Sequence, residues 1–132
     1  MVGKTVSDRE FVAVCALPGP DRYAHFVEQV ADWGEVWSLR GPDGWVLAAG
    51  EDGQPVVPVW PHARYAEACA VGGWTGASPE AIPLDRWVAA WLPGLARDER
   101  GVAVFPVPSG SGMLVDPEQL AADLADAGEQ FE

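Results

Sequence analysis

The chain has 132 residues, a length typical of one domain, and its twenty acidic and eight basic residues give a net charge of −12. Nucleic acids and anionic membranes attract proteins through clustered lysine and arginine, so this charge excludes both as partners. Apolar residues make up 48% and charged residues 21%, which indicates a folded globular protein. The charge remains compatible with a basic protein partner.

The compartment is predicted from three features of the sequence. No apolar run reaches membrane-spanning length, and the apolar residues 11–17 follow a mixed-charge segment rather than the basic start of a signal peptide. Cys15 and Cys69 have no CxxC spacing, so we expect both to be buried and reduced; the alternative is a disulfide between them. Arginine outnumbers lysine seven to one, as in GC-rich bacterial genomes. We therefore expect a bacterial, cytoplasmic protein.

Two helices are predicted near the N-terminus, after a loose end over residues 1–6. Ser7 and Glu10 have the spacing of a capping box, which predicts a short helix over residues 8–16. A second helix begins at Pro20, because a first turn needs no N–H from that residue, and ends near residues 33–34. Its core face carries apolar and aromatic side chains at helical spacing: Tyr23, Phe26, Val27 and Val30.

Three strands are predicted next, over residues 35–39, 45–49 and 56–60. Turn sequences at residues 41–44 and 51–54 separate them, and such short turns indicate an antiparallel meander. Pro58 has no N–H for a ladder, which predicts that the third strand lies at a sheet edge or contains a bulge. An exposed edge there would allow a homodimer, and the alternative is a monomer.

Residues 56–70 read as a strand that turns directly into a helix, and the rest of the chain is arranged around this corner. Pro61 is expected to preset the first turn of the helix, which continues to about Ala70. A Gly-rich loop with Trp74 follows. We expect this loop to fold back over the core because it carries a large aromatic side chain.

The C-terminal half contains a short strand over residues 80–83, a helix, a hairpin and a final helix. The first of these helices should bury one face and be interrupted by Pro93; the face consists of Trp87, Val88, Trp91, Leu92 and Leu95. The hairpin pairs residues 101–107 with residues 113–115. Asp116 and Pro117 start the last helix, whose core face is Leu120, Leu124 and Ala127. The acidic residues of the last seventeen positions are expected on a solvated helix face.

These elements predict the fold class. There is no internal repeat and no linker, so residues 7–132 are expected to form one α+β domain. Its architecture is an antiparallel sheet of about five strands packed by four to five helices.

The sequence holds no phosphate-binding loop, dinucleotide fingerprint or nucleophile elbow. The only soft or borderline metal ligands are His25, His62, Cys15 and Cys69, and their spacing does not predict a closed zinc site. We therefore expect neither a cofactor nor a metal.

The corner supplies the candidate contact residues Trp37, Trp60, His62 and Arg64. An aromatic surface, a titratable ring and a guanidinium can meet there, and tryptophan beside arginine is common at binding hot spots. The alternative interpretation is structural: tryptophans packed in the core, a histidine in a first helical turn and an arginine paired with an acid.

Several short motifs follow one another in a particular order. They are Arg22-Tyr23-x-x-Phe26, Val36-Trp37, Pro58-Val59-Trp60-Pro61, Trp91-Leu92-Pro93-Gly94-Leu95 and Pro117-Glu118-x-Leu120. Together they resemble the bacterial family catalogued as domain of unknown function 2750, over nearly the whole chain from Ser7 to the last helix. The resemblance implies a small cytosolic α+β protein and carries over no activity and no catalytic residue.

Two classes of function are predicted. The first is a non-enzymatic protein-binding or adaptor domain, which includes an immunity- or antitoxin-like protein whose negative charge meets a basic toxin. The alternative is a small enzyme or small-ligand-binding protein with a cleft near Trp60 and His62.

Overall fold

The computed structural model describes residues 5–42, 44–50, 53–108, 110 and 112–130, apart from the side chains of residues 129 and 130. Five residues of the predicted turns lie outside this description: Asp43, Glu51, Asp52, Ser109 and Ser111. The helices are α1 (Asp8–Cys15), α2 (Gly19–Trp33), α3 (Ala63–Ala68), α4 (Leu84–Arg86), α5 (Leu92–Arg97) and α6 (Pro117–Gln130), with a 3₁₀ turn at Gly72–Trp74 and a π-helical turn at Trp87–Trp91. The strands are β1 (Glu35–Gly41), β2 (Gly44–Trp45), β3 (Ala48–Ala49), β4 (Pro55–Val59), β5 (Ser78–Pro83), β6 (Gly101–Val104) and β7 (Met113–Val115).

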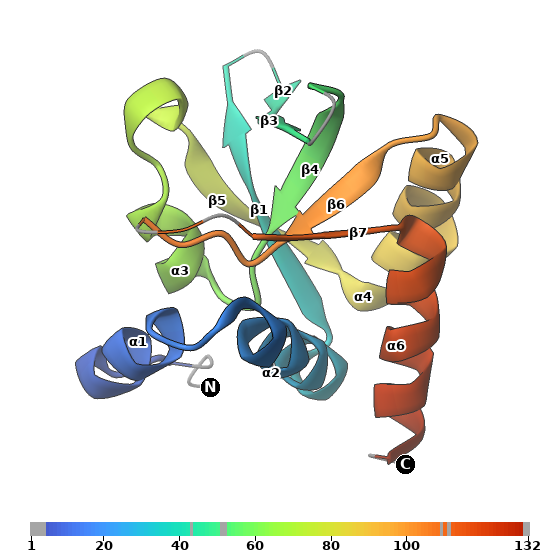
Figure 1. Cartoon of the computed structure of the whole chain (residues 1–132), viewed down its shortest axis with the longest axis horizontal. Coiled ribbons are helices and arrows are strands. Elements are labelled where there is room, and N and C mark those ends of the chain that lie inside the picture. Colours follow the sequence, from blue (N-terminus) through green and yellow to red (C-terminus); the bar gives the residue numbers. More distant parts are fainter. Residues whose placement is uncertain (1–4, 43, 51–52, 109, 111, 131–132) are drawn as a thin grey trace.

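The elements form two sheets with helices packed on them, which confirms the predicted single α+β domain (Figure 1). One sheet has the order β2–β1–β5 and the other β3–β4–β6–β7. Figure 1 shows β4 and β6 side by side at the centre of the molecule, while α5 and α6 stand together at one side.

The helix boundaries follow the local signals that predicted them. Ser7 Oγ accepts the Glu10 N–H at 3.1 Å and so caps α1. Gly34 ends α2 in the left-handed conformation, at φ +75°, which glycine adopts without strain. The predicted loose end at residues 1–6 lies mostly outside the described residues, but Val6 is buried, so the packed chain begins before Ser7.

The predicted antiparallel sheet is wrong in two respects. The expected strand at residues 45–49 divides into β2 and β3, which belong to different sheets. In addition, β4 pairs in parallel with β6, with Val57 opposite Val102. A parallel pair needs a long crossover, and here the connection contains α3, β5 and the α4–α5 segment.

Pro58 does not mark a sheet edge, because β4 lies between β3 and β6. The Val59 carbonyl points toward β6, because it accepts from the N–H of Phe105 in the chain after β6. The Pro58 carbonyl points the other way and accepts from Ser38 Oγ at 2.7 Å. The missing N–H of Pro58 lies on the same side as its carbonyl, away from β6. The short β3 pairs only with Pro55 and Val56, so no ladder hydrogen bond is lost at Pro58.

The predicted strand-to-helix corner forms, with its helix one residue later than expected. His62 is the N-cap of α3, so Pro61 precedes the helix instead of occupying its first turn. At the same corner Trp37 and Trp60 form a bridge between the two sheets, with N–H to carbonyl distances of 2.9 and 2.8 Å. The corner therefore joins the two sheets, in agreement with the expectation that the rest of the chain is arranged around it.

The interruption predicted at Pro93 takes the form of a wider helical turn. Proline lacks an N–H and its ring clashes with the carbonyl four residues earlier, so the helix widens over Trp87–Trp91. The Leu92 N–H accordingly donates to the carbonyl of Trp87, five residues back. Trp87 and Leu92 are buried as expected, whereas Val88 is exposed and the prediction for it is wrong.

His25 on α2 should make stability depend on pH. Its half-buried ring lies 6.3 Å from that of Phe105, and burial lowers its pKa, with Glu10 and Glu28 acting in the opposite direction. The unfolded chain, with a histidine pKa of about 6.5, therefore binds more protons than the folded one. We expect the free energy of unfolding to fall as the pH drops through 6.5, and the His25→Gln variant to lose that slope in urea titrations between pH 7.5 and 5.5. An equal slope in both proteins would contradict this assignment.

Candidate functional site

Of the predicted contact residues, Trp37 and His62 lie at the surface of the corner, and Trp60 lies beneath it. His62 is half-buried, and its ring lies 5.7 Å from that of Trp33 and 6.3 Å from that of Trp37. His62 Nδ1 accepts the Arg64 N–H at 3.0 Å, so the imidazole caps α3. Trp37 is also half-buried, so the structure brings Trp37 and His62 together at one surface.

The Arg64 side chain binds the N-terminal segment. Nη1 donates to the Val6 carbonyl at 2.7 Å, and Nη2 forms an ion pair with Asp8. The guanidinium carbon lies 4.8 Å from the centre of the Phe11 ring. These contacts hold α1 against the domain.

Trp60 lies beneath this surface, because its side chain is fully buried. Its Nε1–H donates to the Pro106 carbonyl at 2.7 Å, and its ring packs edge-on against Trp74 at 6.1 Å. The predicted fold-back of the Trp74 loop is therefore confirmed. Trp60 supports the candidate surface from inside and does not itself form part of it.

A second surface is the outer face of the four-stranded sheet. Successive side chains of a strand point to opposite faces, and the pairing register shows which ones share a face. Large branched side chains fill the core face: Val57, Val59, Val102 and Val104. The opposite face carries the buried Val56, Pro58 and Ala103, the partly exposed Gly101 and the exposed Leu114. Two adjoining hollows lie on it, and both are lined by Gly50 and Leu114. We call them together the outer groove.

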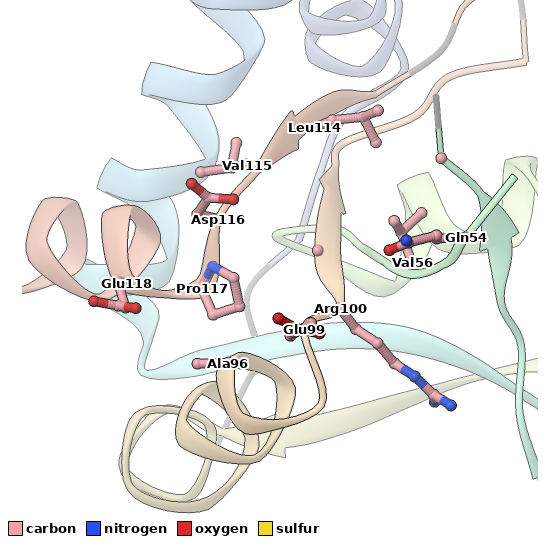
Figure 2. A pocket seen from close by; sticks show the side chains of 12 residues that line it. Gln54, Val56, Ala96, Glu99, Arg100, Leu114, Val115, Asp116, Pro117 and Glu118 are labelled. Carbon is pink, nitrogen blue, oxygen red and sulfur yellow. The ribbon is translucent and has the colours of Figure 1, made fainter. Parts of the chain in front are cut away.

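One end of the outer groove is acidic (Figure 2). This acidic hollow measures about 580 Å³, with Val56, Gly101 and Leu114 from the sheet among its lining residues. Three carboxylates join them: Glu99 from the turn before β6, and Asp116 and Glu118 from the start of α6. The Arg100 side chain points away from Asp116 and Glu118 in Figure 2. Within the described part of the chain, neither salt bridge of the structure involves these carboxylates.

The other end of the groove is apolar and measures about 650 Å³. Ala48 and Ala103 contribute small side chains from the sheet, and Trp74 adds a larger one. Met113 also borders this hollow, but its side chain lies on the other face of the sheet, next to Gly19 of α2. Gly112 also lines this hollow. A Cβ atom there would lie 2.7 Å from the Val104 carbonyl oxygen, so the chain approaches too closely for any other residue. Leu114, at the junction of the two hollows, is 45% exposed.

Sequence reasoning missed the groove because its residues come from distant segments. A usable signal was the alternation of small and large side chains in β6, where Gly101 and Ala103 face one way. The acidic residues of the last helix were expected on a solvated face, and Asp116, Glu118 and Asp126 are exposed as expected. Asp116 and Glu118 also line the groove, while the half-buried Asp123 accepts hydrogen bonds from Tyr23 and Gln119. The side chains of Glu129 and Glu132 lie outside the description.

Thiol and metal chemistry can be assessed for the described residues. Cys15 and Cys69 are free thiols, and burial raises the pKa of Cys69 to about 11 and also that of Cys15. Both thiols are therefore protonated at neutral pH and poor nucleophiles. Across residues 5–130, omitting the undescribed positions, no three His, Cys, Asp or Glu side chains are grouped to hold a metal ion. The described helices also include none long and apolar enough to cross a membrane.

Comparison with known proteins assigns the chain to a class. The family model for a protein of unknown function, DUF2750, matches residues 23–124. This match spans most of the chain, so the protein belongs to the DUF2750 family, and the resemblance predicted from the motifs is confirmed. No curated protein matches the chain.

Proposed function

We propose that this protein is a non-enzymatic binding domain of the bacterial cytoplasm, and that it holds a basic segment of a protein partner in the outer groove. The observation that carries the proposal is the combination of an apolar floor with a carboxylate rim. Apolar side chains of a partner would be removed from water at Leu114 and Trp74, and basic side chains would face Glu99, Asp116 and Glu118.

Electrostatics favour a basic partner at long range as well. The net charge of −12 attracts cationic proteins and increases their association rate, an effect that salt screens. An immunity-like protein that meets a basic toxin is one form of this function. The same negative charge opposes self-association. A homodimer was expected to form through an edge strand containing Pro58, but that strand, β4, lies between β3 and β6. We therefore propose a monomer.

The enzymatic alternative is a small enzyme that uses His62 or an acid in a cleft near the corner. The contacts of His62 instead support a structural role, because its Nδ1 caps α3 and its ring packs against two tryptophans. The two free cysteines are what a reducing compartment favours, which supports the cytoplasmic assignment.

The test is capture of a partner from a lysate of the encoding bacterium by the wild-type protein and two variants. Leu114→Glu places a charge at the centre of the groove, and Val12→Glu places one at a 66% exposed position on α1. We expect a captured protein to be lost with Leu114→Glu, kept with Val12→Glu and reduced at high salt. A partner that both variants retain, or both lose, would place binding elsewhere.

A further inference from the structure

We infer that the outer groove binds an extended segment in which a large apolar residue and a basic residue lie two positions apart. This inference rests on the proposed function and specifies its partner. The spacing of the two hollows along the sheet sets the sequence pattern, and their composition sets the chemistry at each position.

The two-residue spacing between the apolar and the acidic position is found on two adjacent strands. On β6, Ala103 lines the apolar hollow and Gly101 lines the acidic one, two residues apart on the same face. On the adjacent strand, Leu114 lies between the hollows, and Asp116 follows it by two residues. Two residues of a strand span roughly 7 Å. An extended partner repeats its own side chains on one side at the same interval, so the matching pattern is an apolar and a basic residue separated by one other residue.

The chemistry differs between the two ends. Trp74 and Leu114 offer apolar surface around the small side chains of Ala48 and Ala103, which leaves room for a large aliphatic or aromatic side chain. At the other end Glu99, Asp116 and Glu118 line the hollow with a single basic residue, Arg100, whose side chain points away from Asp116 and Glu118. A lysine or arginine is the side chain that complements this end.

Two other occupants fit the groove less well. A second copy of this chain would bring its own net charge of −12 toward the carboxylates. A nucleic acid would bring phosphates to the same place. A basic polypeptide has both the charge and the alternating side chains that the two hollows require.

The experiment uses two synthetic peptides of equal composition and the full-length protein, with affinity measured by calorimetry. One peptide is leucine-threonine-arginine-threonine-arginine, and the other is leucine-arginine-threonine-arginine-threonine, both blocked at their ends. Only the first presents leucine and arginine on one side of an extended chain. We expect it to bind at least about tenfold more tightly, because the second must leave either its leucine or its arginines out of the matching hollow.

Matched variants test the contribution of each end of the groove to peptide binding. Leu114→Gln should weaken the first peptide about tenfold, and Glu118→Lys should weaken it a few-fold and reduce its salt dependence. Val12→Gln and Glu28→Lys change exposed residues that line neither hollow, and should leave the affinity unchanged.

Equal affinity for both peptides would overturn the proposed two-residue spacing between the apolar and the basic residue. If neither peptide binds while Leu114→Glu still abolishes capture of the protein partner, the pattern is wrong and the proposed function stands. If capture survives Leu114→Glu, the proposed function fails as well. A dimer in analytical ultracentrifugation that Leu114→Glu dissociates would assign the groove to a second copy and overturn the inference.

Discussion

Replacing Trp60 with alanine is expected to destabilise the fold by about 3–5 kcal/mol, a large part of the total stability of a domain this size. The side chain is fully buried, and its loss would leave a cavity at the point where the two sheets meet. It would also leave the Pro106 carbonyl without the Nε1–H donor. Urea unfolding monitored by far-UV circular dichroism measures the loss.

The control is Trp60→Phe, which keeps most of the apolar volume and removes the hydrogen bond. We expect it to cost about 1–3 kcal/mol. A loss below about 1 kcal/mol for Trp60→Ala would show that the corner is not central to the fold. Because the alanine variant is expected to be so unstable, it is unsuitable as a binding-site mutation, whereas Leu114→Glu is suitable.

Replacing Arg22 with methionine is expected to cost about 3 kcal/mol. Arg22 is a buried arginine on α2 whose Nε donates to the Phe105 carbonyl at 3.2 Å and whose Nη1 donates to the Leu17 carbonyl at 2.6 Å. Methionine has a similar apolar reach, so the change mainly removes these donors. Urea unfolding gives the free energy.

Hydrogen exchange at Phe105 tests the same contact locally. Phe105 has a φ of +60°, a conformation that is unfavourable for an aromatic residue, and it is held by the Val59 carbonyl on one side and Arg22 on the other. We expect its amide to exchange faster in Arg22→Met and to be partly protected in Arg22→Lys, which retains a cation without the planar fork. Unchanged exchange in Arg22→Met would contradict this role.

The candidate site was only partly predictable. The corner was found because its strand, prolines and helix are contiguous in sequence, and the structure brings Trp37 and His62 together there. The burial of Trp60 was not accessible, since it depends on Trp74 and Pro106. Exposed and buried tryptophans have the same local sequence signals, so only packing distinguishes them.

The sequence by itself determined the α+β class, the family and the positions of most helices. Signals such as Ser7, Gly34 and Pro117 act through backbone groups within a few residues, so they operate before any tertiary contact exists. Only the tertiary structure decided which strands pair, because β4 and β6 are brought together by an intervening crossover. The outer groove arises from that pairing, which places Gly101 and Ala103 of β6 on one face between β4 and the exposed Leu114 of β7. Local propensity carries no information on such long-range pairing, whose free energy depends on side chains that meet only in the folded chain.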